Sequence, residues 1–96
     1  MPDPEVVHIL VVEDSPTQAA QLCHMLEQKG YRVSRAANGK EAMKRLRKRR
    51  PAVIITDVMM PEMDGFELCR AVRDDDELAD LPIILLTSAS DPQDVI

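Results

Sequence analysis

The hydrophobic and polar positions of this chain divide it into short β-type segments separated by longer stretches with helical spacing. The first and third β-type segments are nearly continuous aliphatic runs, which are typical of strands buried on both faces of a parallel sheet. The second segment alternates, with Tyr31 and Val33 on one face. The pattern predicts four strands, at residues 6–12, 31–37, 52–57 and 81–87.

Helical signals fill the intervals between these strands. Ser15 is a suitable cap for a helix that begins at Pro16, because proline has no N–H to lose at the first helical position. Gly30 is expected to end that helix, whose apolar stripe contains Leu22, Met25 and Leu26. Further helices are expected at 40–50, after an Asn38-Gly39 turn, at 66–73, and from Ser90 or Asp91 onward.

Alternating strands and helices at this spacing require crossover connections, which are right-handed in parallel sheets. The sequence therefore predicts an α/β, doubly wound domain with helices on both faces of a parallel sheet. We expect residues 6–96 to form this domain and residues 1–5, with two prolines, to be a flexible lead-in.

Composition narrows the class of protein. The net charge of −5 argues against nucleic-acid binding by the domain, so we interpret the basic run from Lys44 to Arg50 as a solvated helix end. No apolar run exceeds four residues, which excludes a membrane span or a signal peptide. Cys23 and Cys69 have no metal-type spacing and are expected to be reduced, in a cytoplasmic protein.

The candidate chemistry lies at the carboxyl ends of the predicted strands, where ligands collect in such sheets. Glu13 and Asp14 follow the first strand, Asp57 ends the third, and Thr87 ends the fourth. Three converging carboxylates repel one another, and a hard divalent cation such as Mg²⁺ removes that repulsion. An aspartate on such a rim is a candidate nucleophile toward a phosphoryl group. Spacing alone leaves open that these acidic strand ends meet by chance.

Three motifs add a resemblance to these observations. Residues 9–15 read ILVVEDS, residues 54–65 read IITDVMMPEMDG, and residues 82–88 read PIILLTS. In this order and at this spacing they resemble the receiver domain of bacterial two-component response regulators. The resemblance implies a flavodoxin-like fold with strand order 2-1-3-4, continued by a fifth strand in complete members.

The resemblance also implies a role for individual residues. Asp57 is the expected phosphoacceptor, and Thr87 is the expected switch hydroxyl. Glu13, Asp14, Asp57 and the backbone carbonyl of Met59 are the expected Mg²⁺ ligands. The partners implied are a sensor histidine kinase or phosphotransfer protein, which we expect to contact residues 16–30, and an output domain or downstream protein. The module is then no enzyme beyond catalysing its own phosphorylation and dephosphorylation.

One departure keeps alternatives open. In the family, a fifth strand ends in a lysine that pairs with the phosphorylated aspartate, and a last helix follows; neither is found in these residues. We therefore expect an incomplete receiver whose fourth strand is an open edge, and hypothesise a homodimer formed by edge pairing or swapping. A phosphorylation-incompetent, receiver-like interaction module remains the alternative. A phosphatase of the haloacid-dehalogenase type is disfavoured because Met59 stands where its second aspartate belongs.

Overall fold

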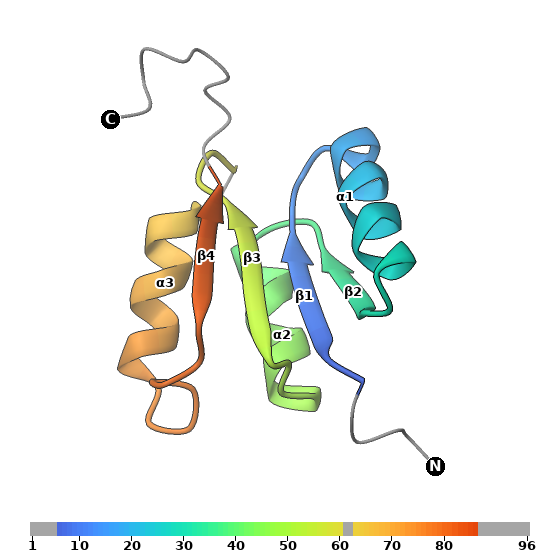
Figure 1. Ribbon diagram of the computed structural model, residues 1–96. Helices are drawn as coiled ribbons and strands as arrows, with labels where there is room; N and C mark the ends of the chain where they lie inside the picture. The colour runs from blue at the N-terminus through green and yellow to red at the C-terminus, as the bar shows by residue number, and fades with distance from the viewer. Residues whose placement is uncertain (1–5, 61–62, 87–96) are drawn as a thin grey trace, which may run out of the picture.

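The computed structural model describes residues 6–60 and 63–86 (Figure 1). These residues form four strands and three helices in alternation. The strands are β1 (His8–Val12), β2 (Arg32–Ala36), β3 (Val53–Asp57) and β4 (Ile83–Leu86). The helices are α1 (Pro16–Gln28), α2 (Gly39–Lys48) and α3 (Gly65–Asp74).

All strand pairs are parallel, and the order across the sheet is β2-β1-β3-β4. This is the flavodoxin-like order, so the predicted fold class is confirmed. Since every strand points the same way, the carboxyl ends of β1 and β3 lie side by side at one edge of the sheet (Figure 1).

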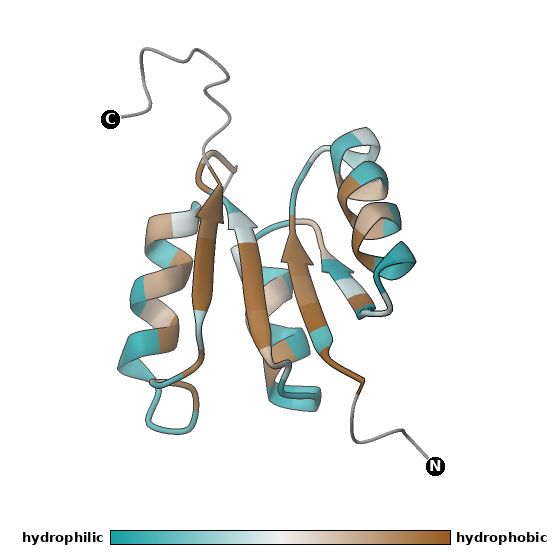
Figure 2. Cartoon of the chain, viewed as in Figure 1, coloured by the Kyte–Doolittle hydropathy of each residue, from teal (hydrophilic) through white to brown (hydrophobic). Residues whose placement is uncertain are grey.

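The two faces of the sheet are covered by different helices, and most strand residues are apolar (Figure 2). On one face, Leu10, Val12 and Ile54 pack against buried residues of α2 and α3. On the other face, Ile9, Val11 and Ile55 pack against α1. Successive strand residues alternate between these two clusters, as the pleat of a strand requires.

Two helices begin one residue earlier than predicted, because a side chain just before each helix caps it. Asn38 and Gly39 were expected to form a turn, but the Asn38 side chain accepts a hydrogen bond from the Glu41 N–H and caps α2, which begins at Gly39. Likewise α3, expected to start at residue 66, begins at Gly65 because Asp64 and Glu67 form a capping box.

The α1 face is only partly covered in the described residues. Leu22 and Leu26 are half-buried as expected, but Met25 of the predicted stripe is 53% exposed. Across from it, Ile84 and Leu86 of β4 are 49% and 40% exposed. The apolar spacing therefore predicted which face of α1 meets the sheet, but the described contacts do not cover Met25.

Two further expectations concern a membrane-spanning helix and the helix predicted after the fourth strand. Within residues 6–60 and 63–86, no helix has both the length and the apolar character needed to cross a bilayer. The predicted helix that begins at Ser90 or Asp91 lies outside the described residues.

Candidate functional site

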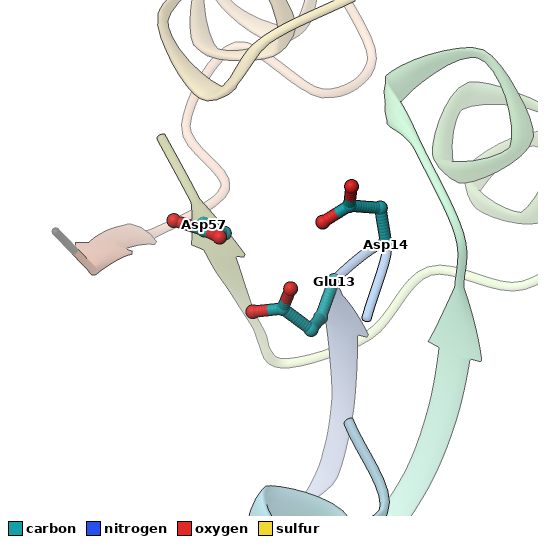
Figure 3. A group of neighbouring side chains, drawn as sticks. All are labelled: Glu13, Asp14 and Asp57. Atoms are coloured by element: carbon teal, nitrogen blue, oxygen red, sulfur yellow. The ribbon is translucent and has the colours of Figure 1, made fainter. Parts of the chain in front are cut away.

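Three carboxylates meet at the carboxyl edge of the sheet, as the topology predicted (Figure 3). Glu13 and Asp14 directly follow β1, and Asp57 is the last residue of β3. One carboxylate oxygen from each lies within 4.8 Å of the other two. The site is therefore formed by two adjacent parallel strands that end at the same level.

The three side chains differ in exposure. Glu13 and Asp57 are buried, with 8% and 7% of their surface exposed, whereas Asp14 is exposed. The buried pair lies at the bottom of the site and Asp14 lies at its rim.

Burial raises the pKa of the Glu13 carboxyl above its ordinary value, and the charges of Asp57 and Asp14 raise it further. The backbone N–H of Ser15, which donates to Glu13 Oε1 at 3.1 Å, acts in the opposite direction. The net direction is upward, so the ionised site carries unfavourable electrostatic energy. A bound cation would relieve that energy.

The residues present fit a divalent cation of the magnesium type. The donors are hard carboxylate oxygens, they are close enough to share one ion, and the exposed rim leaves room for the waters that Mg²⁺ retains. Among the described residues, no cysteine or histidine belongs to this cluster, so a zinc site is disfavoured.

The loop after β3 holds the Asp57 carboxylate in position. The backbone N–H of Met59 donates to Asp57 Oδ1 at 3.4 Å, a long hydrogen bond. The hydroxyl of Thr56, which is fully buried, donates to the Asp57 carbonyl at 3.0 Å. The predicted metal contact by the Met59 carbonyl stays a prediction, and Thr87, the predicted switch residue, lies outside the described residues.

Sequence reasoning missed two residues that position the acidic pair. Arg35 of β2 donates to the backbone carbonyl of Glu13, through Nε at 3.3 Å and through a terminal nitrogen at 3.0 Å. Ser15 was predicted only as a helix cap, yet its N–H holds the Glu13 carboxylate. The sequence contains one sign of the role of Arg35. This charged residue lies two positions after Val33 and therefore on the same side of the strand, a side that otherwise faces inward.

A groove of about 240 Å³ opens beside the acidic site. Glu13 and Asp57 line one part of it, and Leu22 and Met25 of α1 and Leu86 of β4 line the rest, together with two glutamines of α1, Gln18 and Gln21. The buried carboxylates are therefore reached from a surface that is partly apolar.

Comparison with known proteins connects this geometry to a family. A family model described as the response regulator receiver domain matches residues 9–96. The transcriptional regulatory protein AfsQ1 of Streptomyces coelicolor is 44% identical over 88 residues, which are 92% of this chain and 38% of AfsQ1. Protein PilH of Pseudomonas aeruginosa is 34% identical over 91 residues, which are 95% of this chain and 75% of PilH.

Solved structures agree with the sequence comparison. The receiver domain of a signal transduction histidine kinase from Syntrophus aciditrophicus superposes with a TM-score of 0.84 at 52% identity, over 94% of this chain and 68% of that one. The chemotaxis protein CheY4 of Vibrio cholerae gives a TM-score of 0.83 at 40% identity, over 92% and 73%. The chain thus spans well under half of AfsQ1 and about three quarters of PilH and of the CheY4 structure.

Proposed function

Since the chain belongs to the response regulator receiver family, we propose that it is a phosphoacceptor that takes a phosphoryl group on Asp57 from a histidine kinase or phosphotransfer protein. The observation that carries the proposal is the meeting of the Glu13, Asp14 and Asp57 carboxylates within 4.8 Å of one another. Such a cluster is costly without a cation and is suited to phosphoryl chemistry with one.

In the proposed reaction, an Asp57 carboxylate oxygen forms a bond to phosphorus. At the same time the bond between phosphorus and the donor breaks, and its electron pair leaves with the donor imidazole. The Met59 N–H holds Oδ1 of Asp57, which orients the carboxylate for in-line attack. Glu13, Asp14 and Asp57 would hold Mg²⁺, which when bound neutralises charge on the phosphoryl oxygens. The Met59 carbonyl as a further ligand and Thr87 as the switch hydroxyl belong to this proposal.

Intact-mass spectrometry after incubation with acetyl phosphate and Mg²⁺ tests the proposal. We expect the mass to rise by one phosphoryl group, and we expect Asp57→Asn or added EDTA to abolish the gain. Asp76→Asn is the matched control, because Asp76 is an exposed aspartate in the α3–β4 connection and does not belong to the acidic cluster. Absence of modification, in this chain and in a chain extended beyond residue 96, would favour the alternative of a phosphorylation-incompetent interaction module.

The partner surface is part of the proposal. The phosphodonor is expected to dock along α1, because the groove beside the acidic site is lined by Leu22 and Met25 and leads to Asp57. An output domain or downstream protein would read the phosphorylated state. Cys23 and Cys69 are free thiols, which agrees with the proposed cytoplasmic location.

Self-association is a further part of the proposal. β4 is an edge strand of the described sheet, and Ile84 and Leu86 on it expose apolar surface. Such an edge pairs readily with a second copy. Light scattering after size-exclusion chromatography tests this, and a stable folded monomer at high concentration would contradict it.

A further inference from the structure

A second cavity lies on the opposite side of the sheet from α1, away from the acidic site. It has a volume of about 150 Å³ and is lined by one histidine, one serine, three basic residues and two apolar ones: His8, Ser34, Arg45, Lys48, Arg49, Leu10 and Pro51. None of the acidic residues that the structure describes lines it, although the chain carries a net charge of −5. The cavity is thus a local concentration of positive charge on an acidic protein.

The histidine in this cavity has unused hydrogen-bonding capacity. His8 Nε2 lies 2.8 Å from the Ser34 hydroxyl, an interaction that joins β1 to β2. Its Nδ1 is buried and has no hydrogen-bond partner among the described residues. Buried polar atoms in folded proteins are nearly always paired, so an unpaired nitrogen in a cavity wall indicates a place for a ligand or a water.

The end of α2 supplies the charge around this histidine. Arg45 and Lys48 belong to the last turn of α2, and Arg49 follows as its C-cap. Of these three basic residues, only Arg45 pairs with an acidic side chain in the described residues, that of the partly exposed Glu41 at 3.4 Å. Arg49 lines the cavity together with His8, and Arg32 is the partner of His8 in the register of β1 and β2. The pKa of His8 is lowered by burial and then by the charges of Arg49 and Arg32.

The apolar part of the cavity wall consists of Leu10 and Pro51, which are both buried. A cavity of this volume accommodates a molecule of about the size of benzene. We propose that this cavity binds a small organic anion, in which an apolar body contacts Leu10 and Pro51 and one carboxylate or phosphate group pairs with Arg49 and Lys48. This site does not involve Asp57 and is independent of the proposed phosphoacceptor function.

The two histidines of the chain allow a direct test. His8 lines the cavity, whereas His24 is exposed on α1 and serves as an internal reference. The imidazole resonances of both are followed by NMR during titration with benzoate, phenyl phosphate, inorganic phosphate and the neutral benzyl alcohol. We expect benzoate or phenyl phosphate to shift the His8 resonances saturably, to leave His24 unmoved, and to raise the pKa of His8.

Matched arginine variants separate the cavity from general basic charge. Arg49→Gln should weaken binding about tenfold, as expected for the loss of one charge-assisted hydrogen bond. Arg47→Gln removes a neighbouring exposed arginine that does not line the cavity, so binding should be unchanged. The two head groups, compared in the titration, distinguish a carboxylate ligand from a phosphate ester.

Several outcomes would overturn the inference. If benzyl alcohol binds as tightly as benzoate, the negative charge of the ligand plays no part in binding. If inorganic phosphate binds as tightly as phenyl phosphate, the apolar body of the ligand plays no part. Equal loss of affinity in Arg47→Gln and Arg49→Gln would assign the effect to the basic helix surface. Absence of any saturable His8 shift would exclude the site.

Discussion

The backbone of Gly65 lies directly against the backbone carbonyl of Asp57. A methyl group added at Gly65 would lie 2.6 Å from that oxygen and 2.9 Å from the Cα of Val58. The Gly65 N–H also donates to the Val58 carbonyl at 2.9 Å. The start of α3 is therefore packed on the strand end that presents the candidate phosphoacceptor.

Replacing Gly65 by alanine tests this contact. Because the opposing atoms are backbone and cannot rotate away, we expect Gly65→Ala to cost about 1–3 kcal/mol of unfolding free energy. We also expect it to slow phosphorylation of Asp57. Denaturant unfolding and the acetyl phosphate assay provide the measurements.

Gly39→Ala is the matched control for this change. Gly39 also starts a helix, but an added methyl group there would meet only side-chain atoms of Met63, of which Cγ and Sδ can rotate away while Cβ at 2.8 Å cannot. We expect a smaller loss of stability and unchanged phosphorylation. Equal effects of the two substitutions would mean that the Asp57 contact has no special importance.

Removal of the Glu13 charge should stabilise the metal-free protein. Glu13→Gln keeps an oxygen for the Ser15 N–H but removes the repulsion with Asp57 and Asp14. Two like charges 4 Å apart cost between about 1 and 4 kcal/mol. With screening we expect a gain of about 1 kcal/mol at pH 7 in EDTA, which corresponds to a melting temperature about 4–8 °C higher.

Mg²⁺ should reverse the order of stability, so that the unsubstituted chain becomes more stable than Glu13→Gln. At a concentration about 100 times its Kd, a ligand stabilises a folded protein by about 2.7 kcal/mol. We expect Mg²⁺ to raise the melting temperature of the unsubstituted chain and to have little effect on Glu13→Gln. A destabilised Glu13→Gln in EDTA, or an equal response to Mg²⁺, would contradict the metal site.

The capping box of α3 gives a third prediction. Asp64 accepts a hydrogen bond from the Glu67 N–H at 2.8 Å, and Glu67 accepts one from the Asp64 N–H at 3.2 Å. We expect Asp64→Ala to cost about 1 kcal/mol, the usual value of an N-cap. Asn38→Ala removes the corresponding cap of α2 and should cost a similar amount. If the α3 cap orients Gly65 and thus Asp57, only Asp64→Ala should also slow phosphorylation.

His8 should make stability depend on pH. Burial and the charges of Arg49 and Arg32 lower its pKa below 6.5, so the unfolded chain takes up a proton first as the pH falls. The stabilisation is therefore complete above about pH 6.5 and is lost as the pH falls toward the lowered pKa. In denaturation at pH 5 to 7, His8→Gln should remove this slope. His24→Gln should keep it, and an unchanged slope in His8→Gln would disprove the assignment.

The sequence predicted the framework of this molecule from local signals. The aliphatic runs located β1 and β3. The rule that ligands collect at the carboxyl ends of parallel strands then predicted that Glu13, Asp14 and Asp57 lie together. These predictions succeeded because each depends on a short segment and on the parallel arrangement of neighbouring strands.

The contacts that the sequence could not predict join distant segments. Arg35 reaches the Glu13 carbonyl from another strand, and Gly65 touches Asp57 across a loop. Asn38 was misassigned because the pair Asn-Gly is typical of both a turn and a helix start, and only the Glu41 N–H decides between them. The roles of Thr87 and of the Met59 carbonyl stay predictions.

The all-parallel pairing of the sheet has a consequence for how the chain folds. β1 lies between β2 and β3, and both of its partners come from much later in the chain: His8 pairs with Arg32, and Ile9 pairs with Val53. No strand can find its neighbour through a hairpin, so loop-closure entropy must be overcome before any ladder forms. During synthesis, β1 cannot be paired on both sides until β3 has been made. Pairing between strands that are distant in the sequence slows folding, whereas the helices between them can form within microseconds from local contacts.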